Sequence, residues 1–292
     1  MIWQTTRFKI DLTQPKLMGI VNLTPDSFSD GGQFDSTFSA LKHVEQLIKD
    51  GADILDLGAE SSRPGAPPVS LEDELARLIP VLKEALKLGV PISVDTYKPQ
   101  VMQAALDEGA DIINDIWGFR RADAGVKAAQ VVMDHGRCGL VMMHMHRDPQ
   151  TMQLDPLPES EDVVARVRND LLSFYEHLAQ IPYGEKASFD LKTRLLIDPG
   201  IGFGKTVAQN FSLLARQREL LELGFPLLAG WSRKSSLGAV TGLQDAKDRV
   251  IPSVAAALLA LERGASVLRV HDVRETAQAL AVWQATCKQD AF

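Results

Sequence analysis

Residues 50–65 read DGADILDLGAESSRPG, and they pass from a glycine turn through an apolar run to a polar patch. A glycine directly after a helix is typical of a left-handed helix cap. The same turn precedes two later apolar runs, as EGAD at 108–111 and as RGAS at 263–266. A recurring turn from helix to strand predicts a fold in which strands and helices alternate along the chain.

Eight short apolar runs each end in a polar or glycine-rich patch of this kind. Eight strands with polar carboxyl ends predict a (β/α)8 TIM barrel whose active site lies on the C-terminal rim. A doubly wound open sheet is the alternative, but no glycine fingerprint follows the first run. The patches are rich in amides, carboxylates, Arg, Lys and His, which indicates a small, charged substrate. They are Asn22–Gly32, Glu60–Gly65, Asp95–Thr96, Asn114–Asp115, His144–His146, Asp198–Gly204, Ser232–Ser235 and Arg269–Asp272.

The segments between the apolar runs carry helical patterns. Apolar residues recur at helical spacing in Thr37–Lys49, Ser70 is placed to cap a helix, and Pro99 suits the first turn of another. No linker divides the chain, so residues 1–292 are expected to form one barrel domain with a motif-bearing core of about 16–287. The irregular segment Ala179–Lys192 follows a helix, and we therefore expect it on the stability face of the barrel.

Composition excludes several classes of function. The 292 residues are 45% hydrophobic and carry a net charge of −7, so there is no basic surplus for nucleic acid or for an anionic membrane. The N-terminus has no apolar signal region, and no run approaches the length of a membrane span. Two cysteines in unrelated contexts imply neither a disulfide framework nor a zinc site. A cytoplasmic enzyme is the expectation.

Two motifs suggest chemistry that their context does not support. Gly204-Lys205-Thr206 looks like the end of a P-loop, but Pro199 occupies the position where that motif needs its first glycine. His144 and His146 lie two residues apart at a strand end, and zinc would need further ligands from other strands. We interpret these histidines as polar residues of the rim.

Charged groups are predicted to meet on the rim. Ser232–Ser235 ends the seventh run beside Arg269 and His271 of the eighth, and Arg63 joins them from the second, which indicates an anionic substrate. Asp95, Asn114 and Asp198 end the third, fourth and sixth runs. Two carboxylates and an amide match the donors and acceptors of an aminopyrimidinone ring. A buried carboxylate needs a partner, and the N–H groups of such a ring would provide one. Surface salt bridges and helix caps are the alternatives for these two sets.

Several of these patches together resemble the dihydropteroate synthase family of folate biosynthesis. The resemblance runs from about Met18 to Val273, with the motifs in the family's order. The motifs are Gly19–Gly32, Gly58–Gly65, Ser93–Thr96, Asn114–Asp115, Asp198–Thr206, Ser232–Ser235 and Arg269–Asp272. Small departures are Ser62, where threonine is more usual, and His146-Arg147, in a segment often written with Gln.

The resemblance implies a pterin-binding barrel that condenses 6-hydroxymethyl-7,8-dihydropterin pyrophosphate with p-aminobenzoate, giving 7,8-dihydropteroate and pyrophosphate. It implies pterin contacts from Asp95, Asn114, Asp198 and Lys234, and pyrophosphate contacts from Asn22, Arg63, Arg269 and His271, with Asn22 also a Mg²⁺ ligand. The p-aminobenzoate pocket would comprise Phe28, Ser62, Arg63, Pro64, Phe203, Ser232 and Ser235. Sulfonamides are the implied competitive inhibitors, and a homodimer through the last helices is the implied assembly.

The chemistry expected from these residues is an SN1-like transfer without a covalent enzyme intermediate. The expected catalytic residues are Asp95, Asp198, Lys234, Arg269 and His271. Two rivals remain: a methyltransferase subunit that uses a folate, and a non-catalytic pterin-binding paralogue. The first would not need the loops at 22–32 and 62–65, and the second should have lost a cation of the rim.

Overall fold

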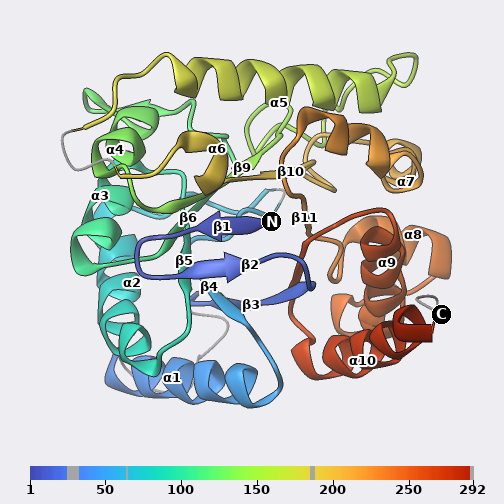
Figure 1. Cartoon of the computed structure of the whole chain (residues 1–292), viewed down its shortest axis with the longest axis horizontal. Helices are drawn as coiled ribbons and strands as arrows, with labels where there is room; N and C mark the ends of the chain where they lie inside the picture. Colours follow the sequence, from blue (N-terminus) through green and yellow to red (C-terminus); the bar gives the residue numbers. More distant parts are fainter. Residues whose placement is uncertain (25–32, 64, 185–187, 290–292) are drawn as a thin grey trace.

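The computed structural model describes residues 1–24, 33–63, 65–184 and 188–289, without the side chains of residues 33–36 and 288–289. Eight parallel strands form one sheet in the order β10-β9-β6-β5-β4-β3-β12-β11, and a parallel bridge between Ile197 and Leu227 joins its two edges (Figure 1). The predicted (β/α)8 barrel is confirmed. The strands are β3 (Lys16–Asn22), β4 (Ile54–Gly58), β5 (Ile92–Asp95), β6 (Ile112–Asp115), β9 (Gly139–Met143), β10 (Leu195–Asp198), β11 (Leu228–Ala229) and β12 (Val267–Val270).

Helices surround the sheet, as Figure 1 shows, and they bury one apolar face against it. Ser70 caps one of them by accepting a hydrogen bond from Asp73 N at 3.0 Å, and Pro99 stands in the first turn of another. The α-helices are α1 (Gln33–Lys49), α2 (Leu71–Ala85), α3 (Pro99–Glu108), α4 (Ala128–His135), α5 (Val163–Ala179), α6 (Leu191–Arg194), α7 (Val207–Ala215), α8 (Ser235–Thr241), α9 (Val250–Glu262) and α10 (Val273–Gln289); the 3-10 helices are η2 (Leu86–Leu88), η3 (Gln217–Leu223) and η4 (Ala246–Arg249).

The predicted glycine turns lie where the helices end. Gly51, Gly109 and Gly264 have φ angles of 105°, 106° and 92°, in the left-handed region that glycine adopts without strain. Each is followed within a few residues by a barrel strand. The repeated turn therefore leads from a helix into three of the barrel strands, β4, β6 and β12.

A short N-terminal hairpin closes the opposite end of the barrel. Its strands β1 (Ile2–Gln4) and β2 (Lys9–Asp11) lie in front of the barrel in Figure 1. Trp3 and Ile10 pack on residues that begin the strands, and Trp3 Nε1 donates to Arg194 O at 2.6 Å. The sequence reasoning did not foresee this plug, which restricts ligands to the C-terminal rim.

The described parts of the irregular segment, residues 179–184 and 188–192, lie at the same closed end. Gly184 N donates to Met133 O at 3.2 Å, and Ser188 N to Gly136 O at 3.4 Å, both at the end of α4. A smaller hairpin, β7 (Ala122–Asp123) and β8 (Val126–Lys127), lies between β6 and α4 in the chain. Within the described residues, no helix is both long and apolar enough to span a membrane.

Candidate active site

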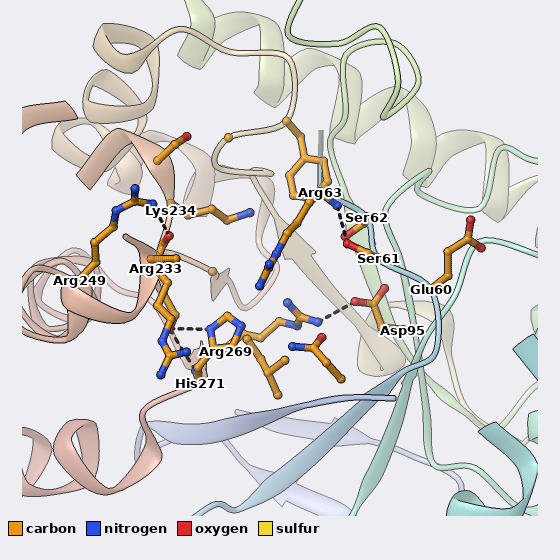
Figure 2. Close-up of a pocket in the computed structure, with 18 of the residues that line it drawn as sticks. Glu60, Ser61, Ser62, Arg63, Asp95, Arg233, Lys234, Arg249, Arg269 and His271 are labelled. Atoms are coloured by element: carbon orange, nitrogen blue, oxygen red, sulfur yellow. Dashed lines mark hydrogen bonds and ion pairs between the residues drawn. The ribbon is translucent and has the colours of Figure 1, made fainter. Parts of the chain in front are cut away.

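A cavity of about 260 Å³ opens at the carboxyl ends of the barrel strands (Figure 2). Ten of the predicted site residues line it: Asn22, Ser62, Arg63, Asp95, Phe203, Ser232, Lys234, Ser235, Arg269 and His271. Asn114 and Asp198 are buried at the ends of β6 and β10, below the lining. Phe28 and Pro64 fall outside the described residues. Residues to which the sequence reasoning gave no role in the site also line the cavity, among them Glu60, Met152, Arg233 and Arg249.

An ion-paired network forms the floor of the cavity. Arg269 donates from Nε to Asp56 Oδ2 and from Nη2 to Asp95 Oδ2, each at 2.6 Å. Asn114 Nδ2 donates to the same Asp56 oxygen at 3.1 Å. Asp56 is fully buried, and it points inward because it alternates along β4 with Leu55 and Leu57, which pack outward on the helices.

Asp56 is a functional candidate that the sequence reasoning missed. The available signal was one carboxylate inside the apolar run Ile54–Leu57. A buried charge of this kind requires a partner. The partner, Arg269, is 213 residues away along the chain, so spacing alone could not identify it.

Burial sets the charge states of the deeper groups. It raises the pKa of Asp95, although Arg269 opposes that shift, and it raises the pKa of Asp198, although a 2.7 Å hydrogen bond from Gly200 N opposes it. Burial also lowers the pKa of Lys234 to about 8, although Asp198 opposes this. Lys234 Nζ lies 4.3 Å from the centre of the Phe203 ring. Carboxylates and an ammonium group thus face one apolar wall.

His271 is neutral in this setting. Burial, together with the nearby cations Arg269, Arg233, Arg63 and Lys234, lowers its pKa to about 3. Its Nδ1 lies 3.0 Å from Ser232 Oγ, which also accepts the backbone N–H of His271 at 3.1 Å. The sequence reasoning counted His271 as a potential cation, and its surroundings make it a neutral hydrogen-bonding group instead.

Arg233 is turned away from the cavity centre toward Asp272. Its Nη2 donates to Asp272 Oδ1 at 2.5 Å and its Nε to Asp272 Oδ2 at 3.0 Å. The Arg233 backbone has a φ of 59°, which is strained for a residue with a side chain. Arg249 Nη1 and Ser253 Oγ bond the Arg233 carbonyl and amide, at 3.1 and 2.8 Å. These contacts fix the turn that presents Ser232, Lys234 and Ser235.

The residues that resembled a P-loop form a rigid turn. Lys205 is buried, and its Nζ donates to Gly200 O at 2.8 Å, Phe203 O at 3.0 Å and His144 O at 3.4 Å. Thr206 then caps α7. Lys205 therefore bonds the backbone rather than a phosphate.

The described residues contain no group of three or more His, Cys, Asp or Glu side chains that could hold a metal ion. His144 instead contacts Asp170, with Nε2 3.0 Å from Oδ2. Asn22 ends β3 and lines the cavity with Arg63, Arg269 and His271. A single amide oxygen fits Mg²⁺ that is shared with phosphate oxygens and water, because Mg²⁺ retains much of its hydration.

Known proteins resemble the chain along nearly its whole length. The family model described as "Pterin binding enzyme" matches residues 18–271. Dihydropteroate synthase of Neisseria meningitidis serogroup B is 47% identical, with 97% of each chain covered. The crystal structure of Burkholderia cenocepacia dihydropteroate synthase complexed with 7,8-dihydropteroate is 46% identical, with a TM-score of 0.86 and 99% of this chain and 98% of that chain covered. Yersinia pestis dihydropteroate synthase with a sulfonamide drug complex is 38% identical, with a TM-score of 0.87 and coverage of 99% and 100%.

Proposed function

The chain belongs to the pterin binding enzyme family, and we propose that it catalyses the condensation of 6-hydroxymethyl-7,8-dihydropterin pyrophosphate with p-aminobenzoate. The products are 7,8-dihydropteroate and pyrophosphate. The observation that carries this function is one cavity with a carboxylate and amide floor under a cationic rim, in a chain 46% identical to a synthase complexed with 7,8-dihydropteroate.

The floor is the proposed pterin site. Asp95, Asn114 and Asp198 offer hydrogen-bond acceptors and an amide to the N–H and C=O groups of the aminopyrimidinone ring. Arg269 is paired with both Asp56 and Asp95, so neither carboxylate lacks a charged partner when a neutral ring enters. Lys234 lies beside Phe203 and completes this site from the β11 side.

The rim is the proposed pyrophosphate site. Arg63 and Arg269 supply charge, while Asn22 and the neutral His271 supply hydrogen bonds. Mg²⁺ held by Asn22 and the diphosphate oxygens would neutralise further negative charge on the leaving group. Arg63 points into the cavity between Lys234 and Arg269 (Figure 2), where it faces this position.

The proposed p-aminobenzoate pocket lies above the pterin site. Phe203 supplies an apolar face, and Ser62 and Arg63 approach from the loop after β4. Ser232 and Ser235 approach from the other side, and Ser235 begins α8, whose free N–H groups suit a carboxylate. Phe28 and Pro64 are predicted members of this pocket. Sulfonamides bind this pocket as competitive inhibitors, because they carry the same arylamine group.

The reaction proceeds by breaking the C–O bond between the pterin methylene carbon and the pyrophosphate. The electron pair of that bond leaves with the pyrophosphate, and the positive charge spreads over the pterin ring. Asp95 and Asp198 stabilise this charge from below. The neutral arylamine nitrogen then attacks the methylene carbon and releases its proton to water or to pyrophosphate. The protein's contribution is charge stabilisation and alignment of the two substrates.

The rival interpretations are not favoured. A methyltransferase subunit would not need the loop after β4, yet that loop contributes Ser62 and Arg63 to the cavity wall. A non-catalytic paralogue should have lost a cation of the site, yet Arg63, Lys234 and Arg269 all line the same cavity.

The decisive experiment incubates purified protein with the pterin pyrophosphate and Mg²⁺, with and without p-aminobenzoate. We expect pyrophosphate release coupled to dihydropteroate formation. Lys234→Ala and Asp95→Ala should each reduce turnover at least about a hundredfold, as loss of an electrostatic contact to the transition state does. Pterin binding without turnover would instead identify the non-catalytic paralogue.

A further inference from the structure

We propose that Glu60 is a positioning residue that holds the loop between β4 and α2 folded back on itself, so that Arg63 reaches into the cavity. The proposal rests on the function proposed above, because it is there that Arg63 acts as a ligand of the diphosphate. Glu60 immediately precedes Ser61, Ser62 and Arg63, and all four residues line the cavity.

The Glu60 carboxylate ties together both ends of this loop. Its Oε1 accepts a hydrogen bond at 3.2 Å from Val69 N, which lies nine positions further along the chain. The same oxygen accepts a bond at 2.7 Å from Tyr97 OH, in the segment between β5 and α3. Its Oε2 pairs with Lys98 Nζ. One side chain therefore closes the loop and anchors it to the barrel.

The anchor is buried and held in turn by its neighbours. Lys98 Nζ also lies 2.6 Å from Glu74 Oε2 on α2, and Glu74 accepts a bond at 2.7 Å from Thr96 Oγ1. The Glu60 side chain is 8% exposed and that of Glu74 is 1% exposed. Burial raises the pKa of Glu74, and Lys98 opposes that shift by favouring its charged form. One lysine thus joins two carboxylates from different elements, which makes the cluster stiff.

The described residues on either side of position 64 are tied by backbone hydrogen bonds. Ala66 N donates to Arg63 O at 3.1 Å, and Gly65 N donates to Pro149 O at 3.4 Å. Arg63 itself is exposed at the mouth of the cavity. Figure 2 shows the Glu60 carboxylate directed away from the cavity and the Arg63 side chain directed into it. Glu60 therefore anchors the loop, and Arg63 contacts the ligand.

Titration calorimetry with Mg²⁺-pyrophosphate on Glu60→Gln and Tyr97→Phe tests this arrangement. Glu60→Gln keeps the shape of the side chain but loses the charge that pairs with Lys98. We expect pyrophosphate to bind about tenfold more weakly to Glu60→Gln, which corresponds to the loss of one charge-assisted contact. Tyr97→Phe should weaken binding less, because one neutral bond is lost.

Two comparisons separate positioning from a general structural effect. In an Arg63→Ala background, Glu60→Gln should change pyrophosphate affinity less than about twofold, because coupled residues are not additive. Binding of 6-hydroxymethylpterin, which lacks the diphosphate, should be unchanged. Glu72→Gln, at an exposed position near the start of α2, is the matched control and should match the parent protein in both assays.

An unchanged pyrophosphate affinity in Glu60→Gln would overturn the proposal, as would an equal loss of affinity for 6-hydroxymethylpterin. Additive effects of Glu60→Gln and Arg63→Ala would also overturn it. A parent protein that binds pyrophosphate but forms no dihydropteroate would refute the proposed function instead, and the calorimetric comparison would still decide the role of Glu60.

Discussion

At the scale of single residues, Arg269 connects the two halves of the candidate site. Its Nε and Nη2 are bonded to the acidic floor, and it lies among the groups that face the proposed diphosphate. A guanidinium group suits this position because its planar donors point in several directions and stay charged. Asp56 and Asp95 orient the plane of the Arg269 guanidinium group. They therefore determine how Arg269 faces the proposed diphosphate, although they do not contact it themselves.

Asp56→Asn tests this dependence. The variant leaves Arg269 with Asp95 as its remaining charged partner, and breaking a buried pair costs about 3 kcal/mol of folding free energy. We expect kcat/KM to fall about a hundredfold, since a misplaced cation loses its contact to the developing charge. Urea unfolding and steady-state kinetics measure the two effects. Asp107→Asn, at an exposed position on α3, is the control, and equal activity of Asp56→Asn and the parent would contradict the role.

Lys234 predicts a pH dependence. Burial lowers its pKa to about 8, so the side chain is charged below that pH and becomes neutral as the pH rises through it. We expect kcat/KM to decline on the alkaline side with an apparent pKa near 8, because the pterin site loses the ammonium group of Lys234. In Lys234→Arg the guanidinium stays charged, so the decline should move to higher pH. A decline at the same pH in both proteins would assign it to another group.

The sequence could predict the site residues that end the strands. It could not predict the residues that hold the loops of the rim in position. Asp95, Lys234 and Arg269 were predicted because each follows an apolar run, and the barrel brings such ends together. Glu60 and Arg249 were missed because their partners come from separate loops, whose approach no spacing rule describes. The neutral state of His271 was missed for another reason, since it depends on burial and on four surrounding cations.

At the scale of elements, the loop between β10 and α7 packs closely on a neighbouring part of the rim. Gly200 and Gly204 have φ angles of 68°, and a Cβ at these positions would lie 1.9 and 2.5 Å from the carbonyl oxygens of His144 and His146. The loop therefore packs directly on the backbone that follows β9. This contact holds Phe203 and the end of Asp198's strand in place.

Gly200→Ala is expected to destabilise the protein by about 3 kcal/mol or more, because left-handed strain and a backbone clash add together. Gly224 has a similar φ of 77° but nothing within 4 Å of the added Cβ. Gly224→Ala should therefore cost only about 1–2 kcal/mol, the strain alone. Chemical denaturation of both variants separates clash from strain. Equal losses in the two proteins would show that the loop after β10 can shift.

The elements themselves followed from the sequence to different extents. Helices with a clear apolar stripe were predicted well, as in α1, where Val44 is buried in the core and Leu41 and Ile48 pack against it. The N-terminal hairpin was not predicted, because three-residue strands are too short for a periodic pattern. Its position depends on long-range contacts, such as the pairing of Arg7 with Asp111 at 2.6 Å.

At the scale of the whole molecule, the net charge of the protein and the charge of its cavity have opposite signs, and the cavity opens at one end of the barrel. The chain carries a net charge of −7, yet its cavity gathers Arg63, Lys234 and Arg269. The hairpin plugs the far end, so an anionic ligand meets these cations only through the rim. The attraction is therefore local, and salt should weaken binding without abolishing it, since partly buried charges are screened less than exposed ones.

The outer surface of α9 and α10 predicts a homodimer. The two helices pack against each other near the C-terminus (Figure 1). Ile251, Ala255 and Leu259 form an exposed stripe at helical spacing on α9, and Val282 is exposed on α10. Ile251 is 82% exposed and Val282 is 69% exposed. Large exposed aliphatic side chains on adjoining helices are typical of a surface that another protein covers.

Ile251→Glu should convert the dimer into a monomer, because a matching surface on the second copy would bring two new charges into one apolar interface. Light scattering after size exclusion should then give a mass near 32.0 kDa, and we expect the parent protein to give about twice that value. Leu154→Glu is the matched control, since Leu154 is 83% exposed and belongs to the loop after β9 rather than to α9 or α10. It should remain dimeric.

A dimeric Ile251→Glu would show that the two copies associate through another surface. A monomeric parent protein would show that they do not associate. None of the residues that line the cavity belongs to the exposed stripe of α9 or to α10, so Ile251→Glu should retain turnover, and loss of association and loss of activity can be measured separately.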